Sequence, residues 1–131
     1  MLVHFPLALF ISAWGLGVAS HIFRKNSLYQ TAVHIYILAA LITPFVVLTG
    51  LWEKERLHLK HPILDLHETF GLLLMFSSLL SLGILWLSHK VSQKRLKIAF
   101  FIFAALMAIF VSVTAFYGGK MVFEYGVGVD M

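Results

Sequence analysis

The chain has 131 residues, 60% of them hydrophobic, and a mean hydropathy of +0.91. Soluble globular domains use about 45–50% apolar residues, so the composition indicates a one-domain integral membrane protein. The absence of cysteine excludes disulfides, thiolate metal sites and covalently attached c-type haem. The net charge is +4, but the aromatic residues lie in apolar runs, so we expect no binding to nucleic acid.

Four apolar runs are each long enough to cross a bilayer, whose core of about 30 Å needs about 20 helical residues. We predict spans at residues 2–23, 28–52, 66–88 and 96–117, and therefore an all-α, four-helix membrane bundle. The first run lacks a preceding basic segment and is longer than the apolar part of a signal peptide, so we interpret it as a retained helix. Pro44 should kink the second span, because it has no amide hydrogen to donate.

The charges orient this bundle. The loops after the first and third spans, extended to residue 97, contain basic residues and no acid: Arg24, Lys25, Lys90, Lys94, Arg95 and Lys97. The other basic residues share the opposite side with all 6 acids. Because basic loops stay in the cytoplasm, we predict a multi-pass protein of the bacterial inner membrane with both termini extracytoplasmic.

Two histidines stand near the starts of parallel spans, His4 in the first and His67 in the third. A single histidine at a helix end is usually interfacial, but ionisable groups within spans are commonly functional. Because these two begin their spans on the same side, we expect them to lie at similar depth and to face one another.

Small residues follow both histidines at helical spacing. Ala8 and Gly15 lie on the stripe of His4, and Gly71 lies one turn below His67. Such stripes let a helix or a flat ligand approach the backbone, and a b-type haem takes one axial nitrogen from each face. We therefore predict one haem b with His4 and His67 as axial ligands. Its propionates would be met by basic residues at the outer side, namely Arg56, Lys60 or Lys120.

The other histidines allow weaker alternatives. His58 and His61 are three residues apart and near His67, a spacing compatible with zinc or copper. We favour a solvated loop there, because Pro62 should interrupt the helix that would align them. On the cytoplasmic side His89 with His21 or His34 would hold a second haem, and His34 is the preferred inner ligand. We expect His89 to reach the lipid headgroups instead.

The final segment, residues 118–131, begins with Gly118-Gly119, which we expect to end the fourth span. It carries apolar and aromatic side chains, among them Phe123 and Tyr125. Glycines allow sharp turns, so we predict that this segment folds over the outer end of the bundle as a cap near His4 and His67.

Several motifs together resemble a known family. They are Val3-His4-Phe5-Pro6, Thr49-Gly50, Asp65-Leu66-His67-Glu68 and the closing Gly118-Gly119 to Gly126-Val127-Gly128 pattern. Over essentially the whole chain they are similar to small four-helix bacterial membrane proteins catalogued as domain of unknown function 2231. That pattern often has Tyr-x-His-Gly in the tail, where this chain has Phe123-Glu124-Tyr125-Gly126. Members of similar design occur beside redox domains, which favours haem.

The resulting hypothesis is a cytochrome b-like subunit that passes electrons between a quinone pool and an extracytoplasmic redox partner. The alternative is a non-redox anchor or accessory subunit of a larger membrane complex. The pattern of a stand-alone hydrolase or transferase is missing from the sequence, so we favour an electron-transfer or accessory subunit over an independent enzyme.

Overall fold

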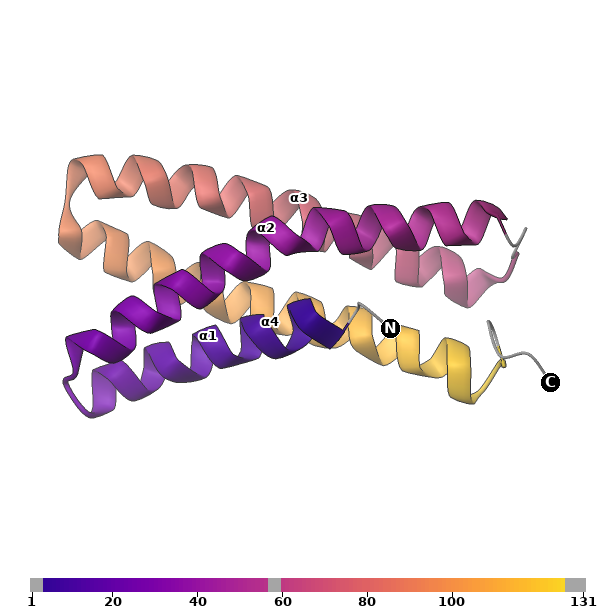
Figure 1. Ribbon diagram of the computed structural model, residues 1–131, viewed down its shortest axis with the longest axis horizontal. Helices are drawn as coiled ribbons and strands as arrows, with labels where there is room; N and C mark the ends of the chain where they lie inside the picture. The colour runs from indigo at the N-terminus through magenta and orange to yellow at the C-terminus, as the bar shows by residue number, and fades with distance from the viewer. Residues whose placement is uncertain (1–3, 57–59, 127–131) are drawn as a thin grey trace.

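The computed structural model describes residues 4–56 and 60–126. Within these ranges the chain forms four α-helices, α1 (His4–Ile22), α2 (Asn26–Arg56), α3 (Pro62–Val91) and α4 (Gln93–Phe123). Figure 1 shows them as an elongated bundle in which consecutive helices run antiparallel. Each helix is long and apolar enough to cross a membrane, which confirms the predicted all-α, four-helix membrane fold. The start of α1 and the end of α4 point toward the end where α2 meets α3 (Figure 1), and the side of the membrane that this end faces stays a prediction.

The helices other than α1 are longer than the predicted spans. α2 continues to Arg56 and α3 begins at Pro62, so the predicted polar loop is partly helical. α4 continues through Gly118 and Gly119 to Phe123. The prediction that these glycines end the fourth helix is therefore wrong. The reason is that the amide ladder persists, with the Glu124 N–H donating to the carbonyl of Lys120 at 3.0 Å.

Helix α1 has only 19 residues, whereas α2 has 31. A rise of about 1.5 Å per residue makes α1 shorter by roughly 18 Å. Figure 1 shows the consequence, since α1 begins well short of the end reached by the other helices. The same view shows α2 changing direction near its middle, as expected for a helix that contains Pro44.

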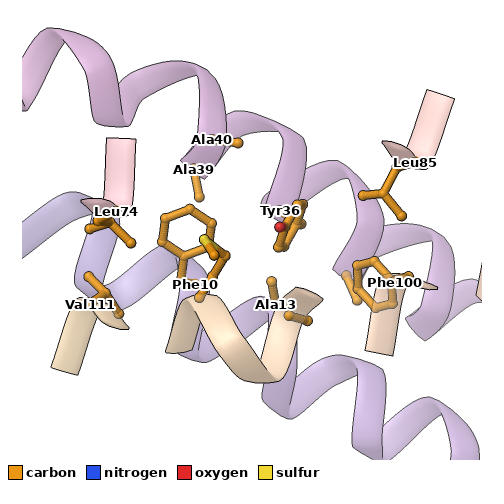
Figure 2. Close-up of a cluster of buried hydrophobic side chains, with 12 residues drawn as sticks. Phe10, Ala13, Tyr36, Ala39, Ala40, Leu74, Leu85, Phe100 and Val111 are labelled. Atoms are coloured by element: carbon orange, nitrogen blue, oxygen red, sulfur yellow. The ribbon is translucent and has the colours of Figure 1, made fainter. Parts of the chain in front are cut away.

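The core is centred on Tyr36 of α2, which is fully buried (Figure 2). Its ring lies edge-on to Phe10 of α1 at 5.5 Å and to Phe100 of α4 at 5.7 Å between centroids. Its hydroxyl lies 2.6 Å from the hydroxyl of Ser81 on α3. Ser81 donates its own hydrogen to the Ser78 carbonyl, so Tyr36 is the donor. One side chain thus joins all four helices at a common level.

Small residues fill the space around these rings. The buried alanines are Ala13 of α1, Ala32, Ala39 and Ala40 of α2, and Ala104 of α4. They let the helix backbones approach closely, which is how membrane helices pack in the absence of a hydrophobic force between them. Large apolar side chains face outward instead, such as Phe45 at 72% and Phe76 at 63% exposure, and are suited to contact lipid.

Candidate functional site

His67 lies half-buried between α3 and α4 near the α2–α3 end of the bundle. Its Nδ1 is 3.0 Å from the backbone carbonyl oxygen of Thr114 on α4. A carbonyl can only accept, so Nδ1 carries the proton in this bond. In the neutral form of the ring the lone pair then lies on Nε2, which can accept a proton or bind a metal.

Gly118 makes room for this ring. A Cβ atom added at Gly118 would lie 3.1 Å from Cε1 and 3.4 Å from Nδ1 of His67. Thr114 and Gly118 are one turn apart on α4, so they present the accepting carbonyl and the open space on the same face. The Thr114 carbonyl and the space at Gly118 thus hold the imidazole ring between α3 and α4.

Aromatic and glycine contacts surround the histidine on the same helices. Phe70 of α3 stacks on Tyr117 of α4 with 5.3 Å between centroids and 9° between planes. Gly71, one turn along from His67, is buried, and a Cβ there would lie 4.0 Å from Val47 of α2. Gly71 therefore belongs to the face of α3 that packs against α2.

A charged cluster flanks this site. Lys54 of α2 forms ion pairs with Asp65, at 3.0 Å, and with Glu68, both in the first turns of α3. Asp65 is also in the first turn of α3, where the helix dipole favours negative charge. Lys54 thus links α2 to α3 through these two ion pairs.

His61 caps the start of α3, where its Nδ1 accepts a hydrogen bond from the Ile63 amide at 3.3 Å. Pro62 occupies the first position of the helix, so it starts the helix where we expected it to interrupt one. The ring of Tyr125 lies 4.6 Å from the His61 ring between centroids. Tyr125, two residues after the end of α4, therefore lies against the start of α3.

His4 does not share this site. It is exposed, as are Ala8 and Gly15 on the same stripe. The face of α1 that packs in the bundle is a different one, formed by Pro6, Phe10, Ala13, Gly17 and Ser20. The prediction that the stripe of His4 lines an internal site is therefore wrong, because that stripe faces outward.

The two histidines also differ in depth. Phe10 and Ser81 both contact Tyr36 and so mark one level. From that level His4 lies six residues outward, roughly 9 Å, and His67 lies fourteen residues outward, roughly 21 Å, at 1.5 Å per residue. The predicted similar depth fails because α1 is the short helix. Within one chain the two imidazoles are therefore not placed to ligate one iron.

The family model described as "Predicted membrane protein (DUF2231)" matches residues 1–131, the whole chain. The chain belongs to this family. No curated protein and no solved structure matches it. The resemblance seen in the motifs of this DUF2231 chain is thereby confirmed, and the family description gives a membrane location without an activity.

The remaining predicted site residues of this DUF2231 chain are dispersed. His34 is exposed and bonds the carbonyl of Gln30 on its own helix at 2.7 Å. Lys120 pairs with Glu124 at 3.6 Å. His58 and the side chain of Arg56 lie outside the described residues. Among the residues described, no group of three or more histidines and acids is placed to hold a metal, so His61 and His67 form no such group there.

Two residues of the site, Thr114 and Gly118, were not predicted from the sequence. Gly118 was interpreted as a helix end, and Thr114 as part of an apolar span. The available signal was their spacing of four residues on one helix, which places a small residue and a polar residue on one face. We refer to His67, Thr114 and Gly118 together as the His67 site.

Proposed function

We propose that this chain is a membrane-embedded electron-transfer subunit that binds one haem b through Nε2 of His67. The observation that carries the proposal is the bond from Nδ1–H of His67 to the Thr114 carbonyl. Histidines that bind metals almost always donate their other ring N–H to a carbonyl or carboxylate, which fixes the ring and raises its basicity. Haem iron held by a protein imidazole can act as a one-electron carrier.

The surroundings support a cofactor at this end of the bundle. The imidazole is held by α3 and α4, which are both long helices, and a rigid support is what an axial ligand needs. Phe70 and Tyr117 provide aromatic surface one turn away. Lys60 is exposed just before α3, and its positive charge is available to pair with a propionate. Lys54 is already paired with two carboxylates.

The proposed location is the inner membrane of a bacterial cell, with the His67 site toward the outer face. Basic loops at the opposite end favour this orientation. Electrons would then pass between quinone in the bilayer and a redox protein outside the cytoplasm. His4 is not part of this proposal, because its outward position and different depth separate it from His67.

Optical spectra of the purified protein from haem-replete cells test the proposal. We expect a reduced-minus-oxidised b-type spectrum and a pyridine haemochrome, both lost in His67→Ala. His34→Ala is the matched control, because that histidine is exposed and bonded within its own helix. His4→Ala and His58→Ala should also retain the spectrum. A colourless wild-type protein would overturn the proposal.

A second candidate is a non-redox anchor or accessory subunit of a larger membrane complex. The observation that favours it is an exposed stripe of α1, which contains His4 and the small residues Ala8 and Gly15. Such a stripe lets a helix of another protein approach closely. In that case the bond from His67 to Thr114 would serve only to join α3 to α4. Stoichiometric co-purification of a partner, without an absorbing cofactor, would support this candidate over the first.

A further inference from the structure

A basic pocket lies at the end of the bundle opposite the His67 site. It has a volume of about 430 Å³ and is formed where the α1–α2 turn meets α4. Three of its lining residues carry a positive charge, Arg24, Lys25 and Lys97. None of the residues that line it is acidic. The pocket therefore concentrates positive charge around a hollow.

These charges are far from the acids of the chain. The acidic residues that the structure describes are Glu53, Glu55, Asp65, Glu68 and Glu124, all near the other end. From Asn26 to Glu53 along α2 the separation is roughly 40 Å at 1.5 Å per residue. This distance exceeds the Debye length of about 8 Å at physiological salt several times. The pocket's charge is thus left for an anion from outside the chain.

Tyr29 provides a second, independent feature. Its hydroxyl oxygen is buried and has no hydrogen-bond partner among the described residues. The ring lies under the Lys97 ammonium, 5.2 Å from the centroid, and edge-on to Phe100. Buried hydroxyls are normally satisfied, so this one, on a residue that lines the pocket, has a donor that the described residues leave unused.

The first turn of α2 adds unpaired amides. The helix begins at Asn26, which also lines the pocket, and it has no acid in its first turn. The amino end of a helix carries free N–H groups and partial positive charge, both of which favour phosphate. The pocket is also lined by Ser20, His21, Ile22 and Phe101. Ile22 and Phe101 offer apolar surface that a free ion would leave unused.

We propose that this pocket binds the phosphate of an anionic phospholipid headgroup, with the glycerol and upper acyl chains against Ile22 and Phe101. Arg24, Lys25 and Lys97 contact the phosphate oxygens, and the Tyr29 hydroxyl donates to one of them. The location agrees with the chemistry, because basic pockets between membrane helices on the cytoplasmic side recognise anionic headgroups. The site is independent of any cofactor at His67.

The test is thermal unfolding of the purified full chain in detergent, titrated with dioctanoyl phosphatidylglycerol. Ligand that binds the native state raises the unfolding midpoint. We expect a saturable rise with phosphatidylglycerol, a much smaller one with dioctanoyl phosphatidylcholine, and little with inorganic phosphate. Equal rises with the two lipids, or a response to inorganic phosphate alone, would overturn the assignment to an anionic lipid.

Three variants locate the binding within the pocket. Arg24 has φ 52, where glycine is favoured, so Arg24→Gly removes the guanidinium without backbone strain. Arg24→Gly and Lys97→Gln should each weaken the apparent affinity roughly tenfold, as expected for a lost hydrogen bond to a charged group. Tyr29→Phe should weaken it less, while the lipid-free protein stays at least as stable as wild type.

Lys94→Gln is the matched control, because Lys94 is exposed in the first turn of α4, three residues before Lys97, and does not line the pocket. It should leave the affinity within about twofold of wild type, since its exposed charge acts through screened solvent. Equal losses of affinity in Lys94→Gln and Lys97→Gln would mean that binding depends on the overall positive charge and not on the pocket. That result would overturn the proposal.

Discussion

The imidazole of His67 fits against Gly118 of the neighbouring helix so closely that a Cβ on that glycine would lie 3.1 Å from Cε1. Gly118→Ala should therefore push the ring and weaken its bond to the Thr114 carbonyl. We expect a loss of about 1–3 kcal/mol in the free energy of unfolding, the usual cost of overpacking. Thermal or denaturant unfolding in detergent measures it.

Gly119→Ala is the control for this substitution. A Cβ at Gly119 meets nothing within 4 Å, and alanine is favoured over glycine inside a helix by about 1 kcal/mol. We expect Gly119→Ala to be neutral or stabilising. If the two alanine variants had the same stability, the close contact between His67 and Gly118 would be contradicted.

Tyr36→Phe tests the centre of the core. The substitution removes the hydroxyl that bonds Ser81 at 2.6 Å and keeps the ring contacts. Hydrogen bonds between membrane helices are worth about 0.6 kcal/mol on average and up to about 1.7, so we expect a loss in that range. Tyr29→Phe is the matched comparison on the same helix, because its hydroxyl has no partner in the described structure. An equal loss in both variants would disprove the assigned bond.

Lys54→Met tests the link between α2 and α3. Lys54 bridges Asp65 and Glu68, but these groups are partly exposed, so we expect a loss of at most about 1 kcal/mol. The difference from wild type should shrink as salt is raised from 0.05 M to 0.5 M, because salt screens such pairs. Unfolding in detergent at the two salt concentrations measures it. A loss that is independent of salt would contradict the ion pairs as its cause.

The orientation can be tested directly because the chain contains no cysteine. Single cysteines at Ser27 and at Lys60 lie in exposed positions at opposite ends of the bundle. We expect a membrane-impermeant maleimide added to intact spheroplasts to label Lys60→Cys and to leave Ser27→Cys unlabelled. The reverse pattern would invert the proposed topology and place the His67 site on the cytoplasmic side.

The number and approximate position of the helices followed from the sequence, because apolar length is dictated by bilayer thickness. The helix ends did not, because the helices extend beyond the hydrocarbon. Lys54, for example, lies in α2 and is stabilised by two acids of α3. Charged residues of this kind were interpreted as loop.

The facing of α1 could not be predicted for a different reason. Lipid and protein interior are both apolar, so hydropathy does not separate the packed stripe from the lipid-facing stripe. Small residues occur on both, Ala8 on the exposed side and Ala13 on the buried side. The choice is made by contacts with other helices, such as Phe10 with Tyr36.

The depth of His4 relative to His67 could not be predicted from the sequence either. Position within a span gives depth only when the compared helices begin at the same level. α1 begins deeper than α3, as the contacts of Tyr36 with Phe10 and Ser81 reveal. His67 was singled out by its place within a span, and the structure places it half-buried between α3 and α4. Its partners on α4 could not be predicted, because they depend on the packing of two helices distant in sequence.

The role of His67 as a haem ligand is tested by chemical rescue of His67→Ala with free imidazole. The variant is purified, supplied with haem, and titrated with imidazole while the visible spectrum is recorded. We predict that His67→Ala binds haem weakly or not at all, and that imidazole restores a b-type spectrum with about one haem per chain. A variant that keeps the wild-type spectrum without imidazole would contradict His67 as the ligand.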